Sequence, residues 1–419
     1  LSNAYESNYT TQRVGPGFRY SKDRNTFVAN VYYQHSVLDG QVTQGESEEI
    51  RHSYDDFTYF MMGQLMINRE NSLRLFINSS TSNPDVTSLQ GVYDLSDAQN
   101  ISHGNPTLNP SYSHRINFHY INSNVEKGRT FMWMFSLQST SDYIGTHTVQ
   151  NPSFTVDGET YTPNFYSTPV NLDGYLSLRT HLSYGFPIGF LRSNFNVMAG
   201  VSYTNTPSMY GMDDGGIDPE TGAISGGERN DTENMGYDFR AVLGSNISEN
   251  VDFTLSWNGT YNEATNSLST TNSKNRYFNH TASGDLKIVF PLGFTLTASA
   301  AYTQYLGFTN DYNDDYLLCN AYIGKKLFKN QRGEIMFGVN DIFNQNKSFV
   351  RTTGSGWTQN ATNSVIGRYF MVQFSFNLRR FGKKGSTNIK DYDGVEPAPR
   401  RRGMMGPGPG GPPPGFGPR

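Results

Sequence analysis

Apolar and polar residues alternate along many short segments of the chain. In residues 368–381, every even position from Phe370 to Leu378 is apolar, whereas Ser375 and Asn377 between them are polar. Successive side chains of a strand point to opposite faces, so this period of two predicts a strand with one apolar and one polar face. A soluble β-sandwich and an outer-membrane barrel, whose apolar face contacts lipid, both produce this pattern.

The alternation recurs throughout the first 381 residues. It is clearest in residues 191–203, 251–261 and 294–303. Weaker segments of the same kind cover residues 13–20, 27–35, 57–67, 73–79, 115–121, 131–139, 175–186, 237–247, 281–290, 317–327 and 333–343. Together these segments predict about 15 strands, and no segment has a convincing helical period, so we expect an all-β protein.

The predicted connections alternate in length. Short turns are expected near residues 22–25, 70–72, 125–128, 186–189, 248–250, 291–293 and 329–332. Long polar segments cover residues 39–53, 80–111, 140–174, 205–235, 263–278, 306–315 and 344–362. Bacterial outer-membrane barrels have tight periplasmic turns and long extracellular loops, whereas the Greek keys of a sandwich do not sort their loops in this way. The pattern favours an antiparallel transmembrane β-barrel.

The composition agrees with a barrel. Only 36% of the 419 residues are hydrophobic, although 14% are aromatic. This combination is typical of a polar lumen and polar loops around a narrow lipid-facing band with aromatic girdles. The net charge of -4 gives no reason to expect a nucleic-acid partner. Cys319 is the single cysteine, which excludes an internal disulfide framework and a cysteine-based zinc site.

The strand count predicts that strands are missing before residue 1. With about 15 strands, the first and the last both run toward the short-turn side, whereas a closed single-chain bacterial barrel has an even number. The first residues, 1–4, have no signal-peptide pattern, so we expect residue 1 to be an internal, processed or artificial start.

The composition changes abruptly after residue 381. Residues 395–419 are mostly proline and glycine, with three arginines at 400–402. Such a segment buries too little apolar surface to order itself. We therefore expect a barrel over residues 1–382 and a disordered tail over residues 383–419. A solvated end is favoured over a basic tail that contacts a periplasmic partner or anionic lipid.

Two regions resemble a known family. The sequence GNPTLNP at residues 104–110, followed by Tyr-Ser-His at 112–114, resembles the "GNPxLxP…H" segment of TonB-dependent receptor barrels. Near the end, residues 344–348 with Arg351, and then residues 367–371, resemble the closing strands of Bacteroidetes-type members. The resemblance extends over residues 80–382, and more loosely over the residues before them.

The resemblance implies the outer-membrane barrel of a TonB-dependent receptor in a Gram-negative bacterium. Such a barrel has about 22 strands, an N-terminal plug, and TonB as its partner in the inner membrane. About seven strands would precede those visible here, which makes the first visible strand the eighth and agrees with its direction. Neither a plug nor a TonB box is recognisable in this sequence, so it remains open whether both lie upstream.

Several charged residues fall on the predicted lumen face. We expect ligand contacts from Arg115, His119, Asp238 and Arg240. We expect contacts to the plug from Arg179, His181, Asp285 and Lys287, the last two toward the periplasm. Polar contacts to plug or water are the alternative for the first set.

Other chemistry is not indicated by the sequence. The acidic run at 311–315 lacks the glycine and the distal glutamate of a calcium-binding loop, and residues 213–218 resemble a flexible loop tip. His147 has no second ligand at metal-binding spacing, so we expect a solvated loop residue. No nucleophile with a matching base is recognisable, so we expect neither an enzyme nor a bound cofactor or metal.

Three functions fit a barrel of this kind. The first is uptake of a ligand that is too large or too scarce for porins. The second is a surface receptor or structural barrel without energised transport. The third, a simple porin, is disfavoured by the odd strand count. The family supplies the transport hypothesis, because a fold alone does not establish a function. The long loops 80–111 and 140–174 are expected to set ligand specificity.

Overall fold

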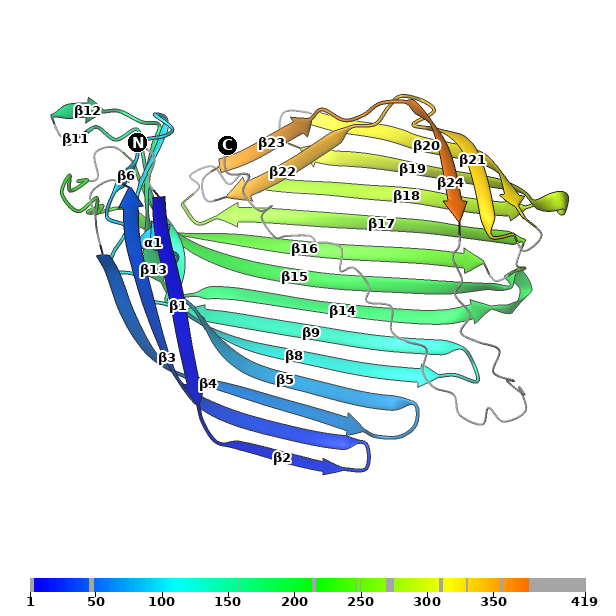
Figure 1. Ribbon diagram of the computed structural model, residues 1–419, viewed down its shortest axis with the longest axis horizontal. Helices are drawn as coiled ribbons and strands as arrows, with labels where there is room; N and C mark the ends of the chain where they lie inside the picture. The colour runs from blue at the N-terminus through cyan, green and yellow to red at the C-terminus, as the bar shows by residue number, and fades with distance from the viewer. Residues whose placement is uncertain are drawn as a thin grey trace. The chain divides into compact units, whose positions relative to one another are not determined.

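The computed structural model describes residues 4–44, 49–156, 158–212, 216–245, 247–248, 250–268, 275–308, 312–328, 331–354 and 357–376. Long strands lie side by side in one sheet (Figure 1). Among the described residues, no helix is long and apolar enough to cross a membrane. The predicted tail, residues 383–419, lies outside these ranges.

In the described ranges, the long strands of the 20-stranded main sheet form an antiparallel meander, in which each strand follows its neighbour along the chain. Its strands are, in this order, β1 (Ala4–Val14), β2 (Gly17–Lys22), β3 (Asn25–Gln44), β4 (Glu49–Met66), β5 (Asn71–Ser82), β8 (Ser111–Asn124), β9 (Arg129–Ser141), β14 (Tyr175–Ile188), β15 (Ser193–Met212), β16 (Glu228–Ser245), β17 (Val251–Asn266), β18 (Asn275–Val289), β19 (Phe294–Phe308), β20 (Tyr312–Leu327), β21 (Gly333–Asn340) and β24 (Tyr369–Phe376). Antiparallel pairing joins successive strands from β3 to β21.

The predicted all-β architecture is confirmed. β1 and β2 both pair with β3 and are separated by Gly15 and Pro16, so they occupy one position. In the described part of the chain, the sixteen strands named above therefore occupy fifteen positions, one for each predicted segment. Short turns follow β2 and β8, and a one-turn 3-10 helix, η2 (Pro291–Gly293), joins β18 to β19. A second, η1 (Gly189–Leu191), joins β14 to β15.

The two faces of the sheet differ as the alternation predicts. On β24, Phe370, Val372 and Phe374 are 71%, 67% and 60% exposed. Exposed apolar side chains in the same orientation lie on other strands, including Phe337, Ile323, Phe294, Leu255, Phe239, Leu182, Trp133, Phe57 and Phe27. The opposite face has polar groups such as the buried side chains of Gln34 and Thr58. Apolar rows exposed along tilted strands are the arrangement that lipid requires.

The last strand lies at one edge of the sheet. The ring of Phe370 on β24 stacks on that of Phe337 on β21, with ring centroids 6.4 Å apart. Within the described ranges, no pairing joins β24 to β1 or β2, so closure of the barrel is not seen there. The total of about 22 strands stays a prediction.

Four segments that were expected to be loops begin and end in strand. These segments are residues 39–53, 205–235, 263–278 and 306–315. β3 and β4 stay paired out to Gln41 and Glu49, and β15 and β16 stay paired out to Tyr210 and Glu228. Beyond a membrane both faces of a strand can meet water, so the apolar alternation that marks a strand is lost.

The long segments 80–111 and 140–174 also fold, with parts of 205–235. They contain α1 (Val86–Leu89), β6 (Tyr93–Asp94), β7 (Asn100–His103), β10 (Tyr143–Gln150), β11 (Phe154–Val156), β12 (Glu159–Tyr161) and β13 (Phe165–Leu172). β6 pairs with β7, β7 with β13, β13 with β10, and β10 with the long-loop end of β15. We call residues 83–110, 142–174 and 216–227 the loop assembly; its short elements gather at one end of the long strands (Figure 1).

Two apolar clusters stabilise the loop assembly. The first contains Leu38 of β3, Val86 and Leu89 of α1, and Leu108, and Ile144 of β10 packs against it. Burying each such side chain contributes about 1.5–3 kcal/mol relative to leaving it exposed. The assembly is therefore attached through its own core to the long strands.

The second cluster contains Ile101, Phe154 and Tyr166, against which Ile217 and Ile224 pack. Ile217 and Ile224 also form an isolated β-bridge. The prediction of a flexible tip at 213–218 is therefore wrong for Ile217, while residues 213–215 lie outside the described ranges.

The segment 344–362 was expected to be a long polar loop. It contains a separate hairpin of β22 (Ser348–Gly354) and β23 (Trp357–Asn363). Before it, the carboxylate of Asp341 accepts hydrogen bonds from the backbone N–H groups of Gln345 and Asn346, at 2.9 and 3.0 Å. This part of the family-like sequence therefore shapes a turn.

Candidate functional site

The charged residues predicted for the lumen lie on four strands of the main sheet. Arg115 and His119 lie on β8, Arg179 and His181 on β14, Asp238 and Arg240 on β16, and Asp285 and Lys287 on β18. β8 and β16 are separated by β9, β14 and β15, which is about 19 Å along the sheet at about 4.8 Å per strand. The residues predicted to contact ligand therefore do not form one cluster on the sheet.

His181 and Asp238 approach each other on the lumen face. His181 Nδ1 and Asp238 Oδ2 are 3.6 Å apart, and the two side chains are 24% and 29% exposed. This separation is longer than a direct hydrogen bond, and the two groups form an ion pair only when the imidazole is protonated. His181 was predicted to face the plug and Asp238 to face the ligand, so the structure brings together one residue of each set.

Gly200 makes this approach possible. It lies on β15, between the two strands, and pairs with both His181 and Asp238 in the register. A Cβ at Gly200 would collide with His181 Nδ1 and with both carboxylate oxygens of Asp238. The absent side chain leaves the space in which the imidazole of His181 and the carboxyl group of Asp238 meet.

Arg115 is held by its neighbours on the sheet. Its Nε donates to Gln138 Oε1 at 3.1 Å, and its Nη1 donates to Ser80 Oγ at 3.1 Å. The ring of His119 lies edge-on to that of Phe76, with ring centroids 6.2 Å apart. These contacts fit a polar lumen surface, and the proposed ligand contact stays a prediction.

The other four predicted residues are more exposed. Arg179 and Arg240 lie on either side of the His181–Asp238 pair, on β14 and β16. Asp285 and Lys287 lie near the turn at η2, at the short-turn end to which the strand directions assign them. The ligand contact expected of Arg240 stays a prediction, as do the plug contacts expected of Arg179, Asp285 and Lys287.

His147 is not the solvated loop residue that was expected. It lies on β10, which has a partner strand on each side, and it is 6% exposed. Burial lowers the pKa of His147, against a hydrogen bond to the backbone of Gly226. A neutral imidazole is therefore part of the buried interior of the loop assembly.

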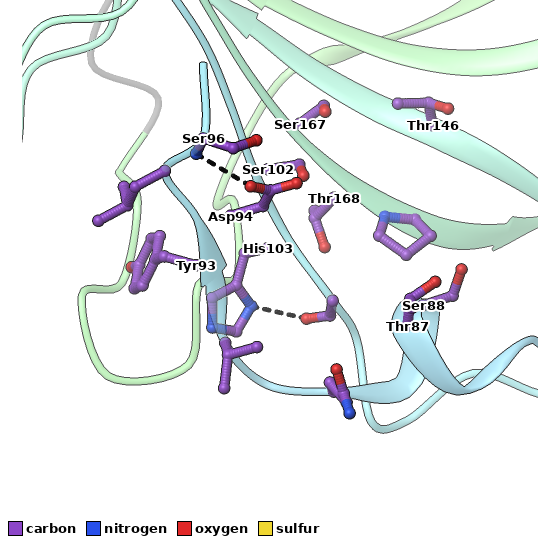
Figure 2. A pocket seen from close by; sticks show the side chains of 15 residues that line it. Thr87, Ser88, Tyr93, Asp94, Ser96, Ser102, His103, Thr146, Ser167 and Thr168 are labelled. Atoms are coloured by element: carbon purple, nitrogen blue, oxygen red, sulfur yellow. Dashed lines mark hydrogen bonds between the residues drawn. The ribbon is translucent and has the colours of Figure 1, made fainter. Parts of the chain in front are cut away.

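The loop assembly contains a cavity of about 610 Å³. Its walls come from α1, β6, β7, β10, β13 and the connections between them. The lining residues are Thr87, Ser88, Gln90, Val92, Tyr93, Asp94, Leu95, Ser96, Ser102, His103, Gly104, Thr146, Ser167, Thr168 and Pro169. Figure 2 shows Tyr93 on one side of the view, Thr87 and Ser88 on the other, and Asp94, Ser102 and Thr168 between them. Both loops expected to set specificity, 80–111 and 140–174, therefore contribute to one cavity.

The family-like GNPTLNP sequence builds a wall of this cavity. The backbone N–H of Asn105 donates to the carbonyl oxygen of Ser88 at 2.6 Å, and its Nδ2 donates to that of Pro169 at 2.9 Å. Asn105 Oδ1 accepts from the N–H of Thr107 at 2.9 Å. One asparagine thus joins α1 to β13, and Leu108 anchors the same segment in the first apolar cluster.

α1 is short but well capped. Asp85 precedes it, and the Oδ1 of Asp85 accepts from the N–H of Ser88 at 2.7 Å and from the hydroxyl of Thr87 at 2.8 Å. Such an N-cap satisfies backbone donors that a single helical turn leaves free. Thr87 and Ser88 are thereby fixed at the cavity wall.

The opposite wall rests on stacked aromatic rings. Tyr93 lies edge-on to His103 at 4.5 Å and stacks on Phe154 at 5.8 Å between ring centroids. The hydroxyl of Tyr166 donates to the carbonyl oxygen of Gly222 at 2.6 Å. Gly222 has a φ of +64°, and a Cβ there would collide with the ring of His103. Both the backbone conformation and the lack of space therefore require glycine.

The cavity has little charge. Burial lowers the pKa of His103, against hydrogen bonds to the backbone of Gly104 and Gly91, so its imidazole is neutral. Hydrogen bonds from the side chain and backbone of Ser96 lower the pKa of Asp94, whose carboxylate stays ionised. Among the described residues that line the cavity, Asp94 therefore carries the only formal charge.

Sequence reasoning did not identify the cavity residues. They are mostly serines and threonines without periodicity, brought together by pairing between β7 and β13, which lie far apart in the sequence. Apart from the length of the two loops, the usable signal was the family-like sequence at 104–110, which marked the wall without revealing its role.

Comparisons with known proteins agree with the fold. The profile of the outer membrane protein beta-barrel family matches residues 33–377. No curated protein matches the chain. Among solved structures, OmpTdeltaL8, a loop L8 deletion mutant of the outer membrane protein OmpT of Vibrio cholerae, is 9% identical, with a TM-score of 0.27 over 76% of this chain and 98% of that one. The family match covers most of the sequence, and the chain therefore belongs to the outer membrane protein beta-barrel family and resides in the outer membrane.

Proposed function

We propose that the chain is the barrel of a TonB-dependent outer-membrane receptor, which captures a ligand too large or too scarce for porins. The cavity within the loop assembly carries this proposal. A passive pore needs no binding cavity in its loops, whereas a receptor needs a preformed cavity with a few placed polar groups. By the orientation of other bacterial barrels, the long loops face the outside of the cell, where ligand arrives.

The family-like sequences support the energised part of the proposal. They resemble TonB-dependent barrels at residues 104–110 and 367–371. The partners would be the lipid of the outer membrane, a plug domain and TonB. A surface receptor or structural barrel without energised transport is the alternative, and it would use the same folded loops.

The proposal is tested by measuring which compounds cells remove from a complex growth medium. Cells with and without the gene are grown with and without a protonophore, and the compounds left in the medium are quantified. We expect at least one compound to be depleted only when the protein is present and the proton-motive force is intact. Depletion that survives the protonophore supports the alternative receptor, and equal depletion by both strains contradicts a role in uptake.

A further inference from the structure

We propose that the cavity of the loop assembly binds a neutral, polyhydroxylated ligand, namely an oligosaccharide. The inference names the ligand class for the proposed function and rests on it. The argument combines the hydroxyl content of the walls, their charge, an unpaired buried amide and an aromatic ring.

Hydroxyl groups dominate the polar lining. Seven of the residues around the cavity contribute one through a serine or threonine side chain: Thr87, Ser88, Ser96, Ser102, Thr146, Ser167 and Thr168. Each hydroxyl donates one hydrogen bond and accepts two, so it can serve a partner of either kind. Sugar hydroxyls have the same dual capacity, and a wall of this composition can pair with them in many orientations.

The charge of the lining disfavours anionic ligands. Asp94 is ionised, and no described lining residue is a lysine or arginine. Carboxylates and phosphates are typically held by arginine, lysine or backbone N–H groups at helix termini. An acidic sugar or an anionic chelate would meet one carboxylate and no compensating cation.

Gln90 offers a hydrogen-bond donor that the protein does not use. It lines the cavity at 5% exposure, and its Nε2 has no hydrogen-bond partner among the described residues. Leaving a buried amide unpaired has a cost, so such a group in a folded protein needs an explanation. A ligand oxygen that accepts from Gln90 Nε2 would remove this cost.

Tyr93 provides an aromatic surface. His103 and Phe154 hold its ring in place, and its hydroxyl donates to the carbonyl oxygens of Asp218 and Pro219 at 3.4 and 3.3 Å. An aromatic ring has an apolar face, and a sugar ring has C–H faces that can pack on it. The fixed ring and the hydroxyl-rich wall together match the two kinds of surface of a saccharide.

Isothermal titration of the full-length protein in detergent tests the ligand class. The probes are neutral hexasaccharides of glucose, mannose, galactose and xylose, a galacturonic acid hexamer, and tetralysine, since Asp94 could attract a basic peptide. We expect at least one neutral hexasaccharide to bind more tightly than either charged probe. We expect Gln90→Leu to weaken that binding about tenfold, the loss of one hydrogen bond.

The controls separate ligand contacts from folding. Gln99→Leu removes an exposed amide outside the cavity and should leave the affinity unchanged. Gln90→Leu removes an amide that is unpaired, so it should not lower the unfolding temperature. The inference is overturned if no neutral hexasaccharide binds, if a charged probe binds more tightly, or if Gln90→Leu keeps full affinity.

These failures do not decide the proposed function. Energised depletion of a compound that is not a saccharide would refute the ligand class and leave uptake intact. If the purified protein binds a saccharide but cells show no energised depletion, the ligand class is supported and uptake is refuted.

Discussion

Individual residues show how a polar lumen is arranged across strands. His181 and Asp238 lie on strands that are not adjacent, and they meet only because Gly200 stands between them. A glycine within a strand normally weakens it, so its presence marks a close approach. The alternation predicted that His181 and Asp238 share a face, but it could not show that the intervening residue leaves room for contact.

Substitution of Gly200 tests this arrangement. We expect Gly200→Ala to separate His181 from Asp238 and to lower the free energy of unfolding by about 1–3 kcal/mol, as overpacking does. Gly244→Ala is the matched control, because a Cβ there meets nothing within 4 Å. Denaturant unfolding in detergent measures both variants, and equal free energies of unfolding would show that the space at Gly200 is not needed.

At the scale of elements, the sequence predicts strands only where their two faces differ. The fifteen positions of the described main sheet were predictable because lipid on one face imposes an apolar row. β7, β10 and β13 lack this contrast, since they pair within the loop assembly, and they were expected to be loops. α1 was missed because one helical turn is too short to show a period.

A charge on the lipid-facing row tests the assignment of faces. Leu182 of β14 is 46% exposed, and Ser183 beside it points to the other face. We expect Leu182→Arg to lower the free energy of unfolding in lipid vesicles by about 2–4 kcal/mol, and Ser183→Arg to lower it far less. A larger loss of unfolding free energy in Ser183→Arg than in Leu182→Arg would show that the lipid contacts the polar face.

The loop assembly should weaken in acid. Burial lowers the pKa of His103 and His147 below the ordinary 6.5. When the assembly is open, both residues take up protons below about pH 6.5, but when it is closed they do not, so the stability present above that pH falls as the pH decreases. Hydrogen exchange of β7 and β10, corrected for intrinsic rates, should show more opening at about pH 5.5 than at about pH 7.5.

The doubly substituted protein His103→Gln, His147→Gln is the control for this effect. Without the two imidazoles, opening of β7 and β10 should change much less with pH. Equal protection of the unsubstituted protein at both pH values would show that the two histidines do not control the stability of the assembly.

At the scale of the whole molecule, a membrane sheet carries a folded assembly at one end. Leu38 belongs to a long strand and is fully buried against α1, so the assembly and the sheet share a core. The length of segments 80–111 and 140–174 singled them out in the sequence, and residues of both line the cavity. The cavity itself was not predictable, because its residues come together only through pairings between distant segments. The local sequence around its serines and threonines has no pattern that predicts these pairings.

We predict that the loop assembly faces the outside of the cell and that the short turns face the periplasm. Labelling with a membrane-impermeant maleimide tests this claim in a Cys319→Ser background, with Glu159→Cys on β12 and Lys127→Cys in the turn after β8. We predict that Glu159→Cys is labelled in intact cells and that Lys127→Cys is labelled only after the outer membrane is permeabilised. Labelling of Lys127→Cys but not Glu159→Cys in intact cells would show that the short turns, and not the loop assembly, face the outside.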